Sequence, residues 1–203
     1  MQHSLQAEGL GVRLRPVRPE DAAFIVWLRN LDHVKGRLGD SAANIKDQHA
    51  WLEKYFAREG DYYFIAETMG GVSVGTHGIY DMADGSAEKG RQAVRPEVMA
   101  GVPSAILATD IAFERLHLRE LRSTTLSTNT KVISLHLKSG FKKVGLSRNH
   151  QTIAGQPVDL VQFLLLPADW DKVREQQLPL ARIAEEQILE WEKTQLGQRQ
   201  PWE

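Results

Sequence analysis

Most residues of this chain whose types and spacing suit chemistry lie in one stretch, residues 88–141. Within it, residues 95–104 form a turn directly before a helical pattern. The first turn of a helix offers backbone N–H groups without intrahelical partners and the positive end of the helix dipole, so it can hold a pyrophosphate. Gly101 permits close approach of a ligand to the backbone, whereas Met99 is bulky and Pro103 lacks an N–H group. The pattern predicts an anion-binding turn that has lost one donor.

Regular elements surround this turn with very little linker. A strand is predicted over residues 87–94, and the helix after the turn carries apolar residues at a period of 3.6. A second strand is predicted over residues 120–127, followed by a short helix that ends at Gly140, a suitable left-handed C-cap. The residues on the buried face of the first helix are Ala105, Ala108, Ala112, Phe113 and Leu116.

The residues before this stretch predict a frame of strands and helices. Residues 1–11 are polar and end in glycine, so we expect them to be frayed. Residues 12–17 alternate like a half-buried strand, and Pro19 opens a helix. Asn44 resembles the cap of a second helix. The apolar positions of the two helices are Phe24, Trp27, Leu28 and Leu31 in the first, and Trp51, Leu52, Tyr55 and Phe56 in the second.

Three antiparallel strands and a helical tail complete the prediction. Residues 62–68 and 72–80 are joined by a glycine pair, and Asp84-Gly85 is a second hairpin signal leading to residues 87–94. The last strands are predicted at 141–146 and 158–166, with a polar excursion at 148–157. From residue 169 the chain is helical and charged, with Pro179 as an interruption. This tail is expected to pack on its own domain or to form an oligomer contact.

Composition narrows the class of protein. A chain of 203 residues can form one well-buried domain with an appendage. The formal net charge of −1 gives no electrostatic reason to expect nucleic acid or an anionic membrane as partner. Cysteine is absent, which excludes disulfides, thiolate catalysis and Cys-based metal sites. Without a long apolar run, we expect a soluble cytoplasmic protein whose partner is a small molecule or a second copy in a homodimer.

Two runs of residues resemble the GNAT acyltransferase family. The run Asn129-Thr-Lys-Val-Ile-Ser-Leu-His-Leu-Lys-Ser-Gly-Phe141 is similar to the family motif of Asn, an apolar pair, an aromatic residue and Gly-Phe. Upstream, Ile111-Ala-Phe-Glu-Arg-Leu-His-Leu118 resembles the end of the family's central helix. The resemblance covers residues 12–166. It implies an α/β (α+β) GNAT fold, with a mixed, mostly antiparallel sheet of about seven strands flanked by helices and an extra helical tail over residues 167–203.

By this resemblance, residues 95–104 hold the pyrophosphate of acetyl-CoA, the implied co-substrate. The family usually shows Arg or Gln, two residues, Gly, one residue, then Gly or Ala. This chain departs from that pattern, because Gly101 takes the last glycine position, Met99 the first and Pro96 the Arg/Gln position. Asn129, besides capping its helix, is implied to bond the pantetheine arm. The residues expected to bind acetyl-CoA are Val94, Met99, Ala100, Gly101, Val102, Ser104, Asn129 and Ser134.

The resemblance also implies two catalytic residues. Where the family carries a Tyr that is taken to protonate the departing thiolate, this chain has His136. Imidazolium, with a reference pKa of about 6.5, is a stronger acid than phenol at about 10, so His136 suits this role while protonated. The alternative is a ring that fills the space of the Tyr without chemistry. The expected general base is Glu88, with His77 or an ordered water as alternatives.

The amino-terminal helices supply the acceptor pocket in most GNAT proteins. Here Trp27-Leu-Arg-Asn30 and His49-Ala-Trp51 resemble the subgroup that acetylates amino groups of nucleotide-linked sugars, including enzymes of the pseudaminic-acid pathway. Arg29 suits a nucleotide diphosphate and Trp51 a sugar or base, although Trp27 also suits a core position. The expected substrate-binding residues are Arg29, Asn30, His49, Trp51 and His77.

We therefore predict an N-acetyltransferase for a small-molecule primary amine. Two alternatives stay open: a peptide amine, as in the ribosomal-protein N-terminal acetyltransferases, and a GNAT-like binding module without catalysis. The seven histidines are scattered, so no metal is predicted. Nothing in the sequence resembles a nucleophilic triad, which favours direct transfer in a ternary complex.

Overall fold

A computed structural model describes residues 3–35, 42–153, 155–195 and 197–203. A single eight-stranded sheet has the order β1-β2-β3-β4-β5-β6-β8-β7. The strands are β1 Ala7–Gly9, β2 Val12–Pro16, β3 Tyr62–Thr68, β4 Ser73–Ala83, β5 Ser86–Val94, β6 Glu120–Leu126, β7 Lys142–Ile153 and β8 Gln156–Leu165. The helices are α1 Ala22–Arg29, α2 Ile45–Phe56, α3 Gly101–Asp110, α4 Thr130–Lys138 and α5 Pro167–Gln195.

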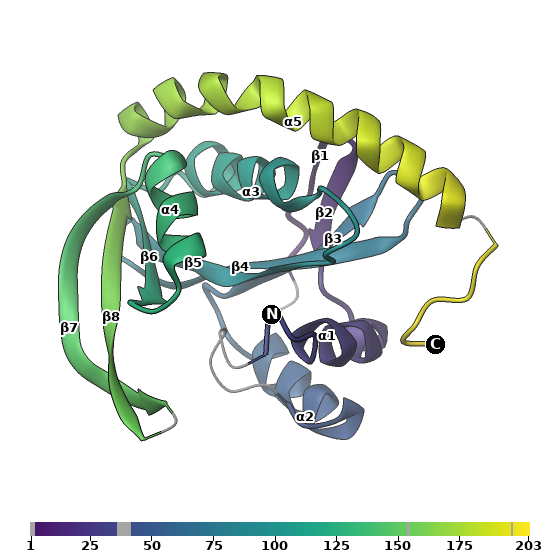
Figure 1. Ribbon diagram of the computed structural model, residues 1–203, viewed down its shortest axis with the longest axis horizontal. Helices are drawn as coiled ribbons and strands as arrows, with labels where there is room; N and C mark the ends of the chain where they lie inside the picture. Colours follow the sequence, from purple (N-terminus) through teal and green to yellow (C-terminus); the bar gives the residue numbers. More distant parts are fainter. Residues whose placement is uncertain (1–2, 36–41, 154, 196) are drawn as a thin grey trace.

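Helices cover both faces of the sheet. Helices α1 and α2 lie on one face, and α3 and α4 lie on the other, with the long α5 running across α3 (Figure 1). Each face has its own buried cluster. Ile106, Ile111 and Phe163 belong to the α3 side, and Ile25 and Leu52 belong to the α1–α2 side. This arrangement is a mixed α/β fold with a mostly antiparallel sheet, as the sequence predicts.

The pairing of β5 with β6 is the feature that creates the site. It is parallel, whereas the other neighbouring strands pair antiparallel. Its register runs from Ser86 with Glu120 to Glu88 with Arg122, after which the two strands diverge. Beyond that point β6 is paired only with β8, as far as Leu126. The divergence opens a wedge in the middle of the sheet.

Two differences from the sequence prediction concern hairpins. The segment expected to be a polar excursion is a long β7–β8 hairpin, with Gln151 opposite Val158. Polar side chains can alternate along such a hairpin because it extends beyond the body of the sheet, where solvent reaches it (Figure 1). Strand β1 pairs with β2 through Ala7 and Leu14, inside the segment that we expect to be frayed. This strand brings the sheet to eight strands, compared with the predicted number of about seven.

Helix α5 continues through Pro179 and packs on its own domain. Near its start, the Trp170 indole donates to Asp110 Oδ1 at 2.9 Å, and the Arg174 guanidinium binds both oxygens of the same carboxylate. These bonds tie α5 to the end of α3. The lost N–H of the proline costs one helical bond, which the packing of the rest of the helix offsets.

The chain's last residues return to the turn that precedes α3. The guanidinium of Arg95 lies 5.2, 4.9 and 5.2 Å from the ring centroids of Trp27, Trp191 and Trp202. It also donates to Gln200 Oε1 at 2.9 Å. Cation–π contacts of this kind are favourable when the cation is removed from water, and Arg95 is buried. The first residue of the turn is thereby fixed against α1, α5 and the tail.

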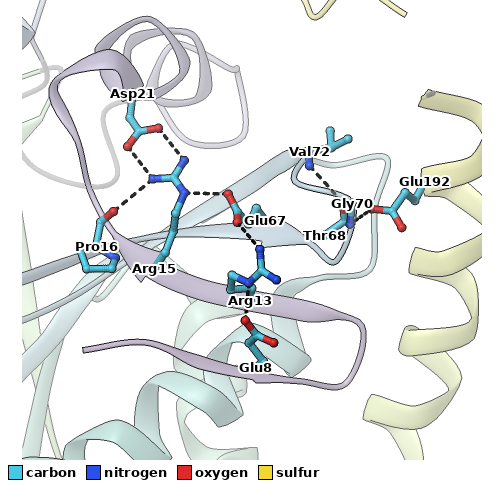
Figure 2. A network of polar contacts seen from close by, with 10 residues as sticks. All are labelled: Glu8, Arg13, Arg15, Pro16, Asp21, Glu67, Thr68, Gly70, Val72 and Glu192. Atoms are coloured by element: carbon cyan, nitrogen blue, oxygen red, sulfur yellow. Dashed lines mark hydrogen bonds and ion pairs between the residues drawn. The ribbon is translucent and has the colours of Figure 1, made fainter. Parts of the chain in front are cut away.

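A network of ion pairs joins β1, β2 and β3 to the start of α1 (Figure 2). Arg15 binds Asp21 through both terminal nitrogens at 2.8 Å, and its Nε donates to Glu67 at 2.7 Å. Arg13 links Glu67 to Glu8. Although burial opposes it, the pairing with the carboxylates of Asp21 and Glu67 raises the pKa of Arg15. This network holds the amino-terminal strand and helix on the sheet.

Candidate active site

The wedge between β5 and β6 contains a pocket of about 390 Å³. Its wall is formed by the diverging strands, by the start of α3 and by one face of α4. His33 and Val34, in the connection after α1, lie at the same pocket. The lining residues from the four main elements are Lys89, Gly90, Arg91, Gln92, Ala93 and Val94 of β5, Ser123, Thr124 and Thr125 of β6, Gly101 and Ala105 of α3, and Lys131, Val132, Leu135 and His136 of α4.

The start of α3 has the features of an anion cradle. Gly101 is the first helical residue, and a Cβ atom built on it would meet no atom within 4 Å. The side chain of Gln92 donates to the Gly101 carbonyl at 3.3 Å, which brings β5 to the helix. The backbone N–H groups of a first helical turn have no intrahelical partner, so those of Gly101 and Val102 are available to a ligand. The space fits a phosphate approaching the backbone.

Some of the predicted acetyl-CoA residues line the pocket, and the others lie outside its lining on the same turn and helices. Val94, Gly101 and Asn129 line the pocket. Asn129 also caps α4, its side chain accepting from the Val132 N–H at 3.4 Å. The other predicted residues lie outside the lining, with Ala100 and Ser104 buried, Val102 half-buried, and Met99 and Ser134 exposed.

His136 projects from α4 into the pocket wall. Its ring packs between Phe141 and Phe163, with centroids 5.0 and 4.9 Å away. Burial, together with the positive charge of Lys89, lowers the pKa of His136 to about 4. The imidazole is therefore neutral at pH 7, in contrast to the ordinary pKa on which the sequence-based acid role depends. To protonate a thiolate, His136 must first gain a proton during the reaction.

Glu88 lies at the last paired position before the strands diverge. Its carboxylate accepts from Thr124 Oγ1 at 2.9 Å, and Thr124 lines the pocket. Burial raises the pKa of Glu88, which the hydrogen bond from Thr124 partly offsets. A carboxylate of raised pKa next to a pocket is suited to accept a proton from an amine.

His77 was predicted to bind the acceptor substrate, but the structure places it in a buried environment. It is fully buried beneath α3, where its Nε2 lies 2.9 Å from Ser104 Oγ. Burial and the charge of Lys89 lower its pKa well below the ordinary value. Its contacts hold the first turn of α3 on the sheet rather than face the pocket.

The residues on α1 and α2 that were predicted to bind the acceptor substrate lie outside the pocket lining and have distinct surroundings. The Asn30 side chain donates to the Val26 carbonyl of its own helix, and His49 is exposed. Arg29 interacts with the buried hydroxyl of Tyr63, whose pKa it helps to lower against the larger effect of burial. Trp51 stacks on Tyr55 at an interplanar angle of 3°.

Arg91 is a residue of this site that the sequence analysis missed. Its backbone has a φ of +52° at an irregularity in the β4–β5 pairing, and its side chain binds Asp61 at 2.5 and 2.9 Å. The guanidinium lies 4.2 Å from the Tyr80 ring centroid and 5.3 Å from that of Trp51. Because Arg91 lines the pocket, it links the wedge to the aromatic residues of the α2 side.

Lys89 is the second missed residue. Its ammonium donates to the Ala105 carbonyl at 3.1 Å and to Thr109 Oγ1 at 2.6 Å. Burial lowers the pKa of Lys89 to about 8, against an opposing effect of Asp110. Below that pH it places a positive charge in the pocket wall.

Replacement of Lys89 by methionine should raise the pKa of His136. The variant removes a nearby positive charge that disfavours the imidazolium, and Lys89 carries this charge throughout the pH range below about 8. An NMR titration of the His136 ring from pH 3 to 7 measures the change. Lys142→Met, which removes an exposed lysine of β7, is the matched control and should leave the titration unchanged. Equal midpoints in Lys89→Met and the wild type would contradict the electrostatic coupling.

The described residues contain no group of three or more His, Asp or Glu arranged to hold a metal ion. Across the same residues, no helix is both long and apolar enough for a membrane crossing.

Comparison with known proteins places these features in context. The family model described as "Acetyltransferase (GNAT) domain" matches residues 12–142. No match was found among curated proteins. The structure of apo FdhC, described as a nucleotide-linked sugar GNAT, is similar with a TM-score of 0.71 at 25% sequence identity, over 90% of this chain and 99% of that one.

Two further solved structures share the fold at lower identity. A GCN5-related N-acetyltransferase from Brucella melitensis has a TM-score of 0.72 at 19% identity, over 85% of this chain and 83% of that one. A mutant of the spermidine N-acetyltransferase SpeG from Vibrio cholerae has a TM-score of 0.70 at 18% identity, over 80% of this chain and 97% of that one.

Proposed function

Because the chain belongs to the GNAT acetyltransferase family, we propose that it transfers the acetyl group of acetyl-CoA to the primary amine of a nucleotide-linked amino sugar. The observation that carries this proposal is the pocket between the diverging strands β5 and β6, which extends to the open side of Gly101. A long, thin donor with a phosphate group along its length suits a pocket that ends at a helix amino terminus.

Acetyl-CoA supplies an acetyl group activated as a thioester. The residues that suit its binding are Gly101 and the first turn of α3 for the pyrophosphate, with Val94 and Asn129 along the pocket for the pantetheine arm. Pro103 removes one N–H group from this turn, which could weaken the cradle by on the order of 1–2 kcal/mol.

Glu88 is the proposed general base for the acceptor amine. Amine attack on a thioester requires the neutral amine, and a carboxylate with a raised pKa can accept its proton. His136 is neutral and can protonate the departing CoA thiolate only after it has gained a proton. In this proposal the acetyl group passes directly to the amine in a ternary complex.

The α2 side of the pocket favours an acceptor that carries negative charge and a planar ring. Arg91 lines the pocket, and its guanidinium, which binds Asp61, lies next to the rings of Tyr80 and Trp51. Arg groups pair well with phosphates, and aromatic rings contact sugars and bases. The likeness to FdhC, described as a nucleotide-linked sugar GNAT, supports the same class of acceptor. A polyamine would bring its positive charges towards Arg91, which disfavours it.

The test combines binding and transfer. Isothermal titration with acetyl-CoA should give a Kd in the micromolar range. Acetyl transfer is then compared for a nucleoside-diphosphate amino sugar, the same amino sugar without its nucleotide, a peptide with a free amino terminus, and spermidine. The nucleotide-linked sugar should exceed the free sugar in kcat/KM by roughly 10- to 100-fold, the worth of one or two charge-assisted bonds.

Other outcomes of this test point elsewhere. Preference for the peptide would favour an N-terminal acetyltransferase, and preference for spermidine would contradict the role given to Arg91. Absence of binding at millimolar acetyl-CoA would contradict the enzyme proposal and favour a binding module.

A further inference from the structure

The side chains of Ser123 on β6 and His136 on α4 meet in the pocket wall. Ser123 Oγ lies 2.6 Å from His136 Nε2. The other ring nitrogen, Nδ1, lies 3.0 Å from the Val132 carbonyl oxygen. A carbonyl can only accept a hydrogen bond, so Nδ1 carries the proton of the neutral ring. The lone pair of Nε2 therefore faces the hydroxyl of Ser123.

This is the arrangement of a serine nucleophile with its base. The diagnostic features are a hydroxyl and a base within about 2.6–3.2 Å, and a third group that orients the base. Here the third group is the Val132 carbonyl, one turn earlier in the same helix. The rings of Phe141, just before β7, and Phe163, on β8, pack against the imidazole. The lowered pKa of His136 keeps the ring in the neutral form that can accept a proton.

The single hydroxyl proton of Ser123 has two acceptors. Besides Nε2, the Lys89 carbonyl lies 2.9 Å from Ser123 Oγ. With a neutral ring, three contacts share two protons, so one contact always lacks a proton. With an imidazolium, all three contacts in this chain of groups are satisfied. When the Ser123 proton moves to Nε2, Nδ1–H still donates to the Val132 carbonyl and the new Nε2–H faces Oγ, so both ring protons keep an acceptor.

A second pair in the chain provides a comparison. Ser104 Oγ lies 2.9 Å from His77 Nε2, a similar distance. However, the Ser104 hydroxyl donates to the Ala100 carbonyl, and both residues are fully buried beneath α3. Ser123 and His136 both line the pocket. Access to the pocket distinguishes the two pairs.

We propose that Ser123 is a nucleophile that accepts the acetyl group of acetyl-CoA, with His136 as its base, and that water releases this group when no amine is bound. The chain would then carry a second activity, acceptor-independent hydrolysis of acetyl-CoA through O-acetyl-Ser123. This inference rests on the proposed function in one respect, that acetyl-CoA enters the pocket. Direct transfer to a bound amine does not require it.

The step balances with the groups present. The hydroxyl proton of Ser123 moves to His136 Nε2 while Oγ bonds to the thioester carbon. The C–S bond breaks with its electron pair on sulfur, and the imidazolium gives its proton to that thiolate. Water then attacks the ester carbon and gives a proton to Nε2, after which the C–Oγ bond breaks and Oγ takes that proton. The products are CoA, acetic acid and the original pair.

Lys89 contributes to the same step from the opposite side of the wedge. Lys89 lines the pocket, and its ammonium, which donates to the Ala105 carbonyl and Thr109 Oγ1, is removed from water. A positive charge in such a site stabilises the oxyanion that forms when Oγ adds to the carbonyl.

The experiment incubates the purified protein with acetyl-CoA in the absence of any amine. Intact mass spectrometry should show the addition of one acetyl group, and peptide mapping should assign it to Ser123 and leave Ser104 unmodified. Free CoA should appear faster than in buffer. Ser123→Ala and His136→Phe should each lower this rate roughly 100-fold, the usual worth of a nucleophile's base. Phenylalanine keeps an aromatic ring between Phe141 and Phe163.

Controls separate this proposal from the proposed function. Ser127→Ala, just beyond β6, removes a hydroxyl outside the pocket lining and should release CoA at the wild-type rate. p-Nitrophenyl acetate is an acetyl donor without CoA and should also label Ser123. Label from this ester without acetyl-CoA binding would overturn the function of the pocket but support the nucleophile.

The contrary result is equally clear. If acetyl-CoA binds by titration, yet neither donor labels Ser123 and CoA is released no faster than in buffer, Ser123 is not a nucleophile. The wild-type measurement decides this even where a variant fails to fold.

Discussion

Replacement of Gly101 by tryptophan should abolish acetyl-CoA binding while the fold stays intact. The direction in which a side chain would grow from this position meets no atom within 4 Å, and the residue lines the pocket. An indole there occupies the space in which a ligand approaches the start of α3. We expect the Kd to rise roughly 100-fold or more, a loss of about 2.8 kcal/mol.

The fold should tolerate this change for the same reason. Gly101 has an ordinary helical backbone, and glycine is less favourable than tryptophan inside a helix. The melting temperature should therefore stay close to that of the wild type. The matched control is Gln176→Trp, which adds the same ring at an exposed position of α5 and should bind acetyl-CoA normally. Normal binding by Gly101→Trp would place the donor elsewhere on the chain.

The fold could be predicted from local patterns because those patterns report burial directly. The strand predicted over residues 62–68, before the glycine pair of a hairpin, matches β3 at both ends. Asn44 caps α2 by accepting from the Asp47 N–H, as its position before the apolar stripe indicates. The β7–β8 hairpin lacks such a signal, because the side chains of residues 148–152 and 155–157 are exposed and give no buried face to mark the strand. Pro179 likewise predicts an interruption of the helix, although α5 continues through it. The packing of α5 on α3 is not visible in a local sequence pattern.

The site was less predictable, since its geometry comes from the divergence of two strands. Lys89 and Arg91 lie on one strand, two residues apart, and reach opposite faces of the sheet because the backbone is irregular at Arg91. Regular alternation would put both side chains on the same face. The sequence gives no sign that Lys89 is buried at the pocket, because a single lysine in a strand is usually solvated.

The pairing of Ser123 with His136 was invisible for a different reason. The two residues are thirteen positions apart and come from a strand and a helix. Their approach depends on how α4 lies over β6, which no sequence period specifies. The motif identified His136 by its position. It did not show what the ring touches, and the contacts set both its pKa and its tautomer.

Replacement of Arg15 by methionine should cause the largest loss of stability. The side chain is 13% exposed and neutralises Asp21 and Glu67, which are 6% and 8% exposed (Figure 2). Without Arg15, two carboxylates stay buried with fewer partners. Asp21 keeps the Arg18 N–H at 2.7 Å, and Glu67 keeps Arg13 at 3.2 Å. We expect the free energy of unfolding to fall by about 3 kcal/mol, the lower end of the range for a broken buried pair, because Arg15 is not sealed from water.

Urea unfolding of a double-mutant cycle tests whether this loss comes from the orphaned charge. Glu67→Met in the Arg15→Met background removes one of the two carboxylates that Arg15 leaves behind, so the double variant should lose less than the sum of the single variants. Arg13→Met is the matched control, because its guanidinium is more exposed and Arg15 remains in place. Its loss should be much smaller than that of Arg15→Met. Equal losses from the two arginines, or strict additivity in the cycle, would mean that burial does not set the value of these ion pairs. Since Asp21 directly precedes α1, weakening this network should loosen that helix.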